Sequence, residues 1–245
     1  MLGLIAGTGF YDWEALKNQH QREVTTPYGN AQVFIGEVGV AGTEKQVVFL
    51  PRHAKNHTIP PHKINYRANI WALKNLGVDK IVAINAVGSL LKNVPPGSIV
   101  LVDDFLDFTY GREHTFFTGG ESGLQHTDMT NCYDHDWQDV IAEAASSAGV
   151  PIVRDGVYVC VQGPRFETRA EIRAYARLGG TVSGMTGVPE VTLANELSLK
   201  YGSLALVTNF CCGLAEAVSD DEVRRVMQSN VKELEKILLE LVRLY

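Results

Sequence analysis

The chain has 245 residues, of which 45% are hydrophobic, and its formal net charge is -6 at pH 7. This length suits one α/β domain with a buried core, and no apolar run approaches the ~18 residues that a membrane span needs. The acidic balance argues against a nucleic-acid partner, which usually meets a basic face. The start, MLGLIAGTGFYDW, lacks a basic segment, so no signal peptide is expected and the cytoplasm is the default compartment.

Short β-branched runs alternate with helical patterns along the chain. The expected strands are LGLIA (2–6), AQVFIGEV (31–38), KQVVFLP (45–51), KIVAINAVG (80–88), SIVLVDDF (98–105), GVYVCVQG (156–163) and SLALVTN (203–209). The expected helices span 65–77, 135–149, 168–180, 189–202 and 219–245. This order predicts a single α/β domain over residues 1–245, in which helices flank both faces of a twisted mixed β-sheet.

Capping signals mark several helix ends. Thr168 with Glu171 matches the capping box, in which two side chains satisfy each other's backbone N–H groups. Gly77 and Gly149 suit carboxyl-terminal caps, and Pro189 suits the first turn of its helix. These signals support the expected ends of the helices.

Three small-residue turns follow expected strands, in GLIAGTGF, NAVGS and SGMTGVPE. In the first, Thr8 lies between two glycines whose backbone can approach an anion closely. Asp12 stands where the dinucleotide fingerprint needs a third glycine, so no Rossmann cofactor is expected. In the third turn, Thr186 can donate to an anion. Each turn is equally compatible with plain packing.

Between Glu44 and Asp79 the chain has six lysines and arginines and no acidic residue. His53 and His57 have the spacing of a helical zinc pair, but two prolines follow and no acidic ligand is near. The four cysteines also lack CxxC spacing, so no metal site is expected. Arg52 with His53 can instead grip phosphate oxygens through a charged fork, with a solvated basic loop as the alternative.

Two further stretches carry groups that suit a heterocycle. In GPRFETRAE, Phe166 places a flat apolar surface beside the acceptor Glu167. In LVTNFCCG, Asn209 offers both a donor and an acceptor at the end of a strand. Together they can sandwich and read a base, or they are a core phenylalanine, a solvated glutamate and a turn asparagine.

Over essentially its whole length, the chain resembles the trimeric purine nucleoside phosphorylases, and most closely the branch of 5′-methylthioadenosine and S-methyl-5′-thioinosine phosphorylases. The matching motifs are GTGF, TPYG, FLPRHAKNHTIPPHKINYRANIWALK, NAVGS, GREHTFF, QGPRFETRAE, GMTGVPE and TNF. The resemblance implies a pentosyltransferase and a homotrimer, with reversible phosphorolysis as the reaction. Inorganic phosphate is then the co-substrate and nucleophile that displaces a purine from ribose C1′, and no other cofactor is needed.

The resemblance also implies roles for individual residues. The phosphate site would be lined by Thr8, Arg52, His53, Ala86 and Thr186. The base would be held by Phe166, Glu167, Asn209 and Cys211, and catalysis would rest on Asn209, Arg52 and His53. The ribose and the 5′ pocket would be formed by Met185, His57, Val223 and, from a neighbouring subunit, His126.

The base pocket departs from the adenine-specific pattern, which has aspartates where this chain reads TNFCC. Glu167 can accept the N1–H that only a 6-oxopurine carries, and the Asn209 amide can donate to N7 or O6. The RHAKNHTIPPHKINY block, by contrast, resembles the methylthio branch. The expected order is therefore 5′-methylthioinosine, then methylthioadenosine, then inosine or guanosine. A nucleotide-sensing binding protein and a nucleoside hydrolase are the alternatives from other classes.

Overall fold

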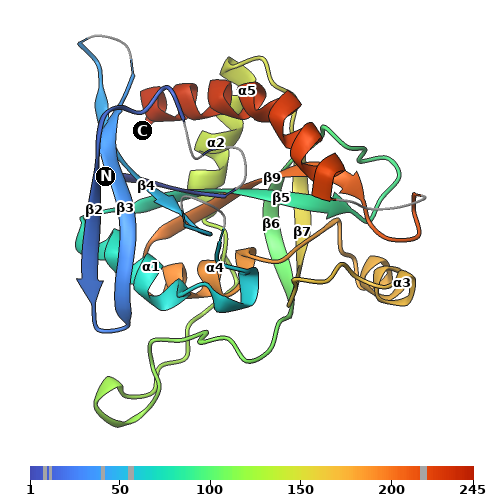
Figure 1. Cartoon of the computed structure of the whole chain (residues 1–245), viewed down its shortest axis with the longest axis horizontal. Coiled ribbons are helices and arrows are strands. Elements are labelled where there is room, and N and C mark those ends of the chain that lie inside the picture. Colours follow the sequence, from blue (N-terminus) through green and yellow to red (C-terminus); the bar gives the residue numbers. More distant parts are fainter. Residues whose placement is uncertain (8–9, 11–12, 40–41, 55–57, 216–219) are drawn as a thin grey trace.

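A computed structural model describes residues 1–7, 10, 13–39, 42–54, 58–215 and 220–245. Within them, one nine-stranded sheet runs through the centre of the molecule (Figure 1). Its strands are β1 (Leu2–Ala6), β2 (Lys17–Thr26), β3 (Gly29–Val38), β4 (Lys45–Pro51), β5 (Lys80–Ser89), β6 (Ile99–Phe108), β7 (Val153–Val161), β8 (Val182–Gly184) and β9 (Lys200–Phe210).

The sheet is mixed, and part of it closes on itself. Its order is β2-β3-β4-β1-β5-β8-β7-β6-β9, and β9 also pairs with β5, so five strands form a ring. β1 runs parallel to β4 and β5, and β5 runs parallel to β9, whereas β3 is antiparallel to both neighbours. All five residues of β1 are buried, as expected for a parallel strand covered on both faces.

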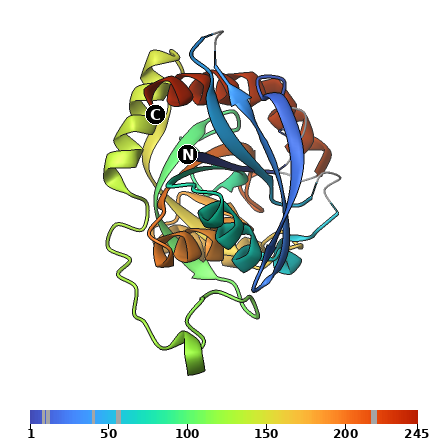
Figure 2. The same cartoon turned by 90° about the vertical axis from the view of Figure 1, so that its left-hand side faces the viewer.

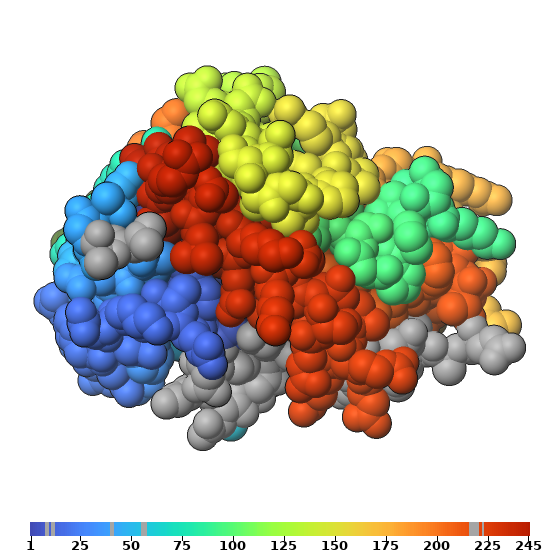
Figure 3. Space-filling model, turned by 90° about the horizontal axis from the view of Figure 1, so that it is seen from above, coloured from blue at the N-terminus to red at the C-terminus, as the bar shows by residue number. Residues whose placement is uncertain are grey.

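Helices cover the two faces of the sheet, which confirms the predicted α/β architecture. They are α1 (Tyr66–Asn75), α2 (His135–Ser147), α3 (Arg169–Arg177), α4 (Gly187–Glu196) and α5 (Asp220–Leu244). α2 and α5 pack on one face through residues such as Trp137 and Leu238, and α1 and α4 on the other through Ile70 and Leu193 (Figures 1 and 2). Seen from above, α5 lies across the surface between the amino-terminal strands and α2 (Figure 3).

The helix signals agree with most of the predicted ends. Thr168 and Glu171 form the complete capping box of α3. Gly77 and Gly149 follow α1 and α2 with φ of 81° and 69°. Pro189 differs from the prediction, because it and the residue before it have non-helical backbone angles, so the regular part of α4 begins after it. No helix in the described residues is long and apolar enough to cross a membrane.

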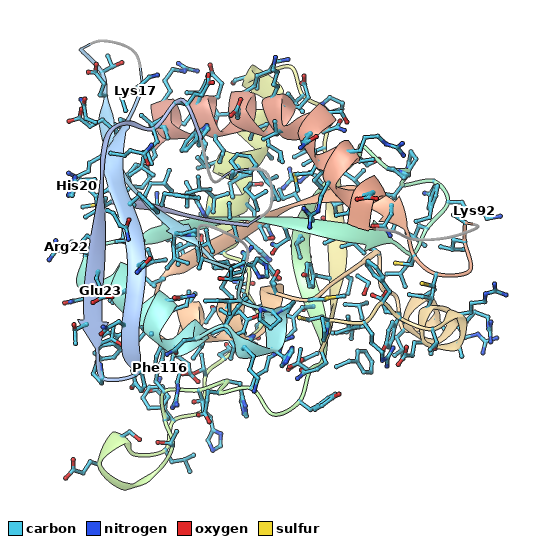
Figure 4. All side chains as sticks on the ribbon, in the orientation of Figure 1. Lys17, His20, Arg22, Glu23, Lys92 and Phe116 are labelled. Carbon is cyan, nitrogen blue, oxygen red and sulfur yellow. The ribbon has the colours of Figure 1, made fainter. Side chains whose placement is uncertain are left out.

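Two strands escape the sequence patterns. β2 reads KNQHQREVTT, and only Val24 and Thr26 in it are buried. It lies at the edge of the sheet and pairs only with β3, so the apolar alternation of a covered strand is not required (Figure 4). β8 has three residues, which is too short for any periodicity.

The segment between β6 and α2, residues 109–131, extends away from the body of the molecule in both ribbon views (Figures 1 and 2). Its Tyr110 and Leu124 are 72% and 79% exposed.

Candidate active site

A cavity of about 360 Å³ lies where several strands end. β1 leads to Gly7 and β4 to Arg52, while the last residues of β5 and β9 contribute Ala86 and Asn209. β1 pairs in parallel with β4 and β5, and β5 pairs in parallel with β9, so the carboxyl ends of these four strands meet at one edge of the sheet. Open α/β sheets bind their ligands at such an edge.

A buried ion pair lies next to the cavity, and its Arg52 belongs to the lining. Arg52 and Glu190 have side chains only 2% and 1% exposed. Arg52 donates from Nε and Nη2 to the two carboxylate oxygens of Glu190, at 2.8 Å each, and from Nη1 to the Ile84 carbonyl at 3.0 Å. The Tyr201 hydroxyl donates to the same carboxylate at 2.7 Å. Burial alone would lower the pKa of Arg52, but Glu190 outweighs it and raises that pKa, so the guanidinium stays charged.

The forked grip predicted for phosphate is therefore made with Glu190. A guanidinium has five N–H groups, and three of those in Arg52 have described partners. The remaining donors of this cavity-lining side chain are the ones that suit an anion.

His53 lies beside Arg52 and is 7% exposed. Its Nδ1 is 2.8 Å from the Ile59 carbonyl, and since a carbonyl only accepts, this nitrogen is assigned the proton. A Cβ at Gly7 would come within 3.0 Å of the imidazole, so glycine allows the two segments to approach each other here.

Thr186 begins α4 and faces the same end of the cavity. Its hydroxyl donates to Asn85 Oδ1 at 3.0 Å, and the Asn85 amide donates in turn to the Ser203 hydroxyl at 2.8 Å. The backbone N–H groups of Thr186 and Gly187 contact the Tyr158 hydroxyl at 3.3 and 3.4 Å. Because these donors of Thr186 and Gly187 already have partners, the charge of Arg52 is what makes this end of the cavity favourable for an anion.

The other end of the cavity carries the groups predicted to read a base. Glu167 is buried, and Ser183 donates its hydroxyl proton to Glu167 Oε1. The Asn209 amide donates to the Phe210 carbonyl at 2.9 Å and accepts at Oδ1 from Thr208 at 2.9 Å. Because both ends of this amide have partners, its orientation is fixed by its surroundings.

Cys211 lies one layer behind this end and is not among the described residues that line the cavity. A Cβ at Gly88 would come within 2.7 Å of its sulfur, which shows how closely the chain just after β9 approaches β5. Burial, and then the charge of Glu167, raise the pKa of the Cys211 thiol, so it keeps its proton. Its contact with a base is therefore indirect.

Arg112 holds the loop that carries Phe166 and Glu167. It donates to the Gln162 side chain and to the carbonyls of Val161 and Gln162 at 3.2, 3.2 and 2.9 Å. It also donates to the Tyr66 hydroxyl at 3.1 Å and to the Val188 carbonyl at 2.6 Å. All five of its N–H groups are thus used to join the loop after β7 to α1 and α4.

Known proteins resemble this chain over nearly its whole length. The family model described as the phosphorylase superfamily matches residues 1–243. The chain belongs to this superfamily. It is 44% identical over 244 residues to the 6-oxopurine nucleoside phosphorylase of Pyrococcus furiosus, covering 97% of this chain and 90% of that protein. It is also 44% identical over 241 residues to a protein of Methanothermobacter thermautotrophicus named "Probable S-methyl-5'-thioinosine phosphorylase", covering 97% and 82%.

A solved structure of Schistosoma mansoni methylthioadenosine phosphorylase in complex with adenine matches with a TM-score of 0.91 and 37% identity, covering 99% of this chain and 91% of that one. These findings confirm the resemblance to the purine nucleoside phosphorylases, with the fold and the class of enzyme, a pentosyltransferase, that it implies.

Most of the residues singled out in the sequence line one phosphorylase cavity. They are Arg52, His53, Ala86, Phe166, Glu167, Met185, Thr186, Asn209 and Val223. Thr8 and His57 lie outside the described residues. His126 is exposed in the segment 109–131 and is not among the described residues that line the cavity. In the part of the chain that the structure describes, no three His, Cys, Asp or Glu side chains are grouped as metal ligands would be.

Sequence reasoning missed four residues that bond to side chains or loops of the candidate site. They are Asn85, Arg112, Ser183 and Glu190. Glu190 carried the clearest signal, because it is an acid inside an otherwise apolar run, VPEV. Such a residue must be paired when its side chain is buried, and Glu190 is 1% exposed.

Proposed function

We propose that the protein catalyses the reversible phosphorolysis of S-methyl-5′-thioinosine to free purine and 5-methylthioribose 1-phosphate. The observation that carries the proposal is the composition of the cavity. Arg52 supplies a cationic group near Thr186, and Glu167 and Asn209, which line the same cavity, supply groups that can read a base. A protein that only sensed a nucleotide would have no need of a site for free phosphate beside the base.

The proposed mechanism needs no nucleophile from the protein. Phosphate bound against Arg52 and Thr186 attacks ribose C1′ as the bond from C1′ to the purine breaks. Negative charge then develops on N7 and O6 of the leaving purine. The Asn209 amide has one N–H on Phe210 and a second left to donate to this charge. Because Thr208 fixes the amide, little reorganisation accompanies the reaction.

The apolar lining favours a methylthio group at the sugar 5′ position. The cavity is lined by Met185, Ile59, Val223 and Met227, together with Pro60 and Pro61. A 5′-hydroxyl would find mainly carbon and sulfur atoms around it. We therefore rank methylthioinosine before methylthioadenosine and before inosine or guanosine, the three classes that the names of the relatives also cover.

We further propose that the enzyme is a cytoplasmic homotrimer, with phosphate as its co-substrate and no metal or other cofactor. The segment 109–131 supports this assembly, because a neighbouring subunit would cover its exposed Tyr110 and Leu124. It also carries His126, which would complete the 5′ pocket of the adjacent subunit. Sedimentation as a fully active monomer would contradict the trimer.

Release of free base from methylthioinosine, methylthioadenosine and inosine, each with and without phosphate, tests the proposal. We expect phosphate-dependent release from all three nucleosides, with the highest kcat/KM for methylthioinosine. Release that ignores phosphate would indicate a hydrolase. Binding of nucleoside without any turnover would indicate a sensor, and a preference for inosine would overturn the assignment of the 5′ pocket.

A further inference from the structure

Ser183 lies in β8, which is held between β5 and β7. It is 3% exposed, and its backbone registers with Gly88 on one side and Val159 on the other. Its hydroxyl donates to Glu167, which lies in the loop after β7. A donor fixed by the sheet therefore holds an acceptor carried by a loop.

This hydrogen bond determines what the wall of the base site offers to a ligand. A serine hydroxyl has one proton, and Ser183 directs it to Glu167. The serine oxygen and the second carboxylate oxygen are then acceptors only. Within the described residues, Ser183 is the side chain that donates to Glu167, so this bond holds the carboxylate in its place beside the base site.

The two common kinds of purine differ at the atom that this wall would meet. A 6-oxopurine carries a proton on N1, whereas N1 of a 6-aminopurine is an acceptor. An acceptor-only wall binds the first and leaves the second with two facing acceptors, which is a costly buried arrangement.

We infer that Ser183 is the positioning residue that sets base specificity, because its bond to Glu167 keeps that carboxylate an acceptor and so selects purines with an N1–H group. The inference rests on the proposed function, since it concerns the base of the same nucleoside. It adds a determinant independent of Asn209, whose amide is fixed by Thr208 and Phe210 instead.

Removal of the hydroxyl should open the site to 6-aminopurines. In Ser183→Ala, Glu167 loses the donor that holds its carboxylate, and the wall loses the acceptor oxygen of the serine. The carboxylate is then free to turn away from the base, so a 6-aminopurine no longer meets two fixed acceptors.

The experiment compares kcat/KM for methylthioinosine and methylthioadenosine. For Ser183→Ala, we expect the ratio of the two to fall about ten- to a hundredfold. Ser183→Thr keeps the hydroxyl and should keep the wild-type ratio. Ser89→Ala is the matched control, because Ser89 is also a buried serine of the sheet, and the described hydrogen bonds of its hydroxyl are with Leu91 in its own turn.

The inference is overturned if Ser183→Ala keeps the wild-type ratio, or if Ser183→Thr changes it as much as alanine does. Should the alanine variant fail to fold, Ser183→Cys replaces it in the test, because a thiol is a weaker donor than a hydroxyl. Its ratio should lie between the wild-type ratio and that of a site that does not distinguish the two bases. Absence of phosphate-dependent turnover in the wild type would refute the proposed function alone. Calorimetric binding of hypoxanthine and adenine would then still test whether Ser183 sets the preference.

Discussion

The buried pair of Arg52 and Glu190 can be tested by Glu190→Gln, which preserves the shape of the side chain and removes its charge. In the structure, Glu190 accepts three hydrogen bonds, two from Arg52 at 2.8 Å and one from Tyr201 at 2.7 Å. Glutamine replaces one acceptor oxygen by an NH2 group. That group would face an N–H or O–H donor, so at least one of the three bonds is lost and the two donors oppose each other.

The expected cost follows from burial. Both side chains are at most 2% exposed, so water cannot take over the lost contacts. A guanidinium left buried without its counter-ion costs about 3–5 kcal/mol, against a total free energy of unfolding of about 5–15 kcal/mol for a typical domain. Glu190→Gln should therefore lower the unfolding free energy by a large fraction of the whole.

Urea denaturation followed by circular dichroism measures the loss. Asp139→Asn is the control, because its partner Arg154 is half exposed, at 2.8 Å in the same kind of contact, and water screens the charges there. Phosphate should stabilise Glu190→Gln more than it stabilises the wild type, because a bound anion restores negative charge next to Arg52. If Glu190→Gln loses no more stability than Asp139→Asn, burial of the pair does not have the energetic role given to it.

Three further outcomes are expected. A hydrogen bond from Arg165 lowers the pKa of Glu171 from 4.5 to about 2, so the ionised Glu171 stabilises the fold fully above pH 4.5 and loses this effect as the pH falls to about 2. The urea midpoints of wild type and Glu171→Gln should therefore differ near neutral pH and converge in acid. A difference that stays constant with pH would contradict this. Arg52→Lys keeps the charge but has three N–H donors instead of five, so fewer remain for phosphate beside Glu190. Initial rates should show KM for phosphate raised roughly tenfold with little change in KM for nucleoside, and an equal rise in both would count against a phosphate role. Asn209→Asp sets an oxygen against the Phe210 carbonyl and should lower kcat/KM for methylthioinosine relative to methylthioadenosine by about one to two decades, whereas an unchanged ratio would exclude Asn209 as a base reader.

The apolar runs of the chain suffice to predict the five helices and the covered strands other than the three-residue β8, because burial on one or both faces leaves a pattern. β2 has no such pattern, since it is an exposed edge whose side chains, among them Lys17, His20, Arg22 and Glu23, need no partner in the core (Figure 4). The pairing of β9 with both β5 and β6 is equally invisible in the sequence. Strand pairing at this range depends on the three-dimensional arrangement and not on local composition.

For the site, residue type and position at strand ends indicated which side chains would meet, and Arg52, Thr186 and Asn209 do line one cavity. Their partners could not be predicted. Glu190 is 138 positions from Arg52 and Asn85 is 101 from Thr186, so nothing in either neighbourhood reveals the contact. The fork of Arg52 is the clearest case, because its chemistry suits a carboxylate and a phosphate equally well.

The cavity draws its walls from both ends of the chain, from Gly7 after the first strand to Met227 in the last helix. Its halves come from segments that meet only when the long-range pairings of the sheet are complete. A partly folded molecule with native helices would still lack a closed pocket, and contacts of such wide sequence separation form slowly. During refolding from urea, recovery of enzyme activity should accordingly lag behind recovery of helical circular dichroism.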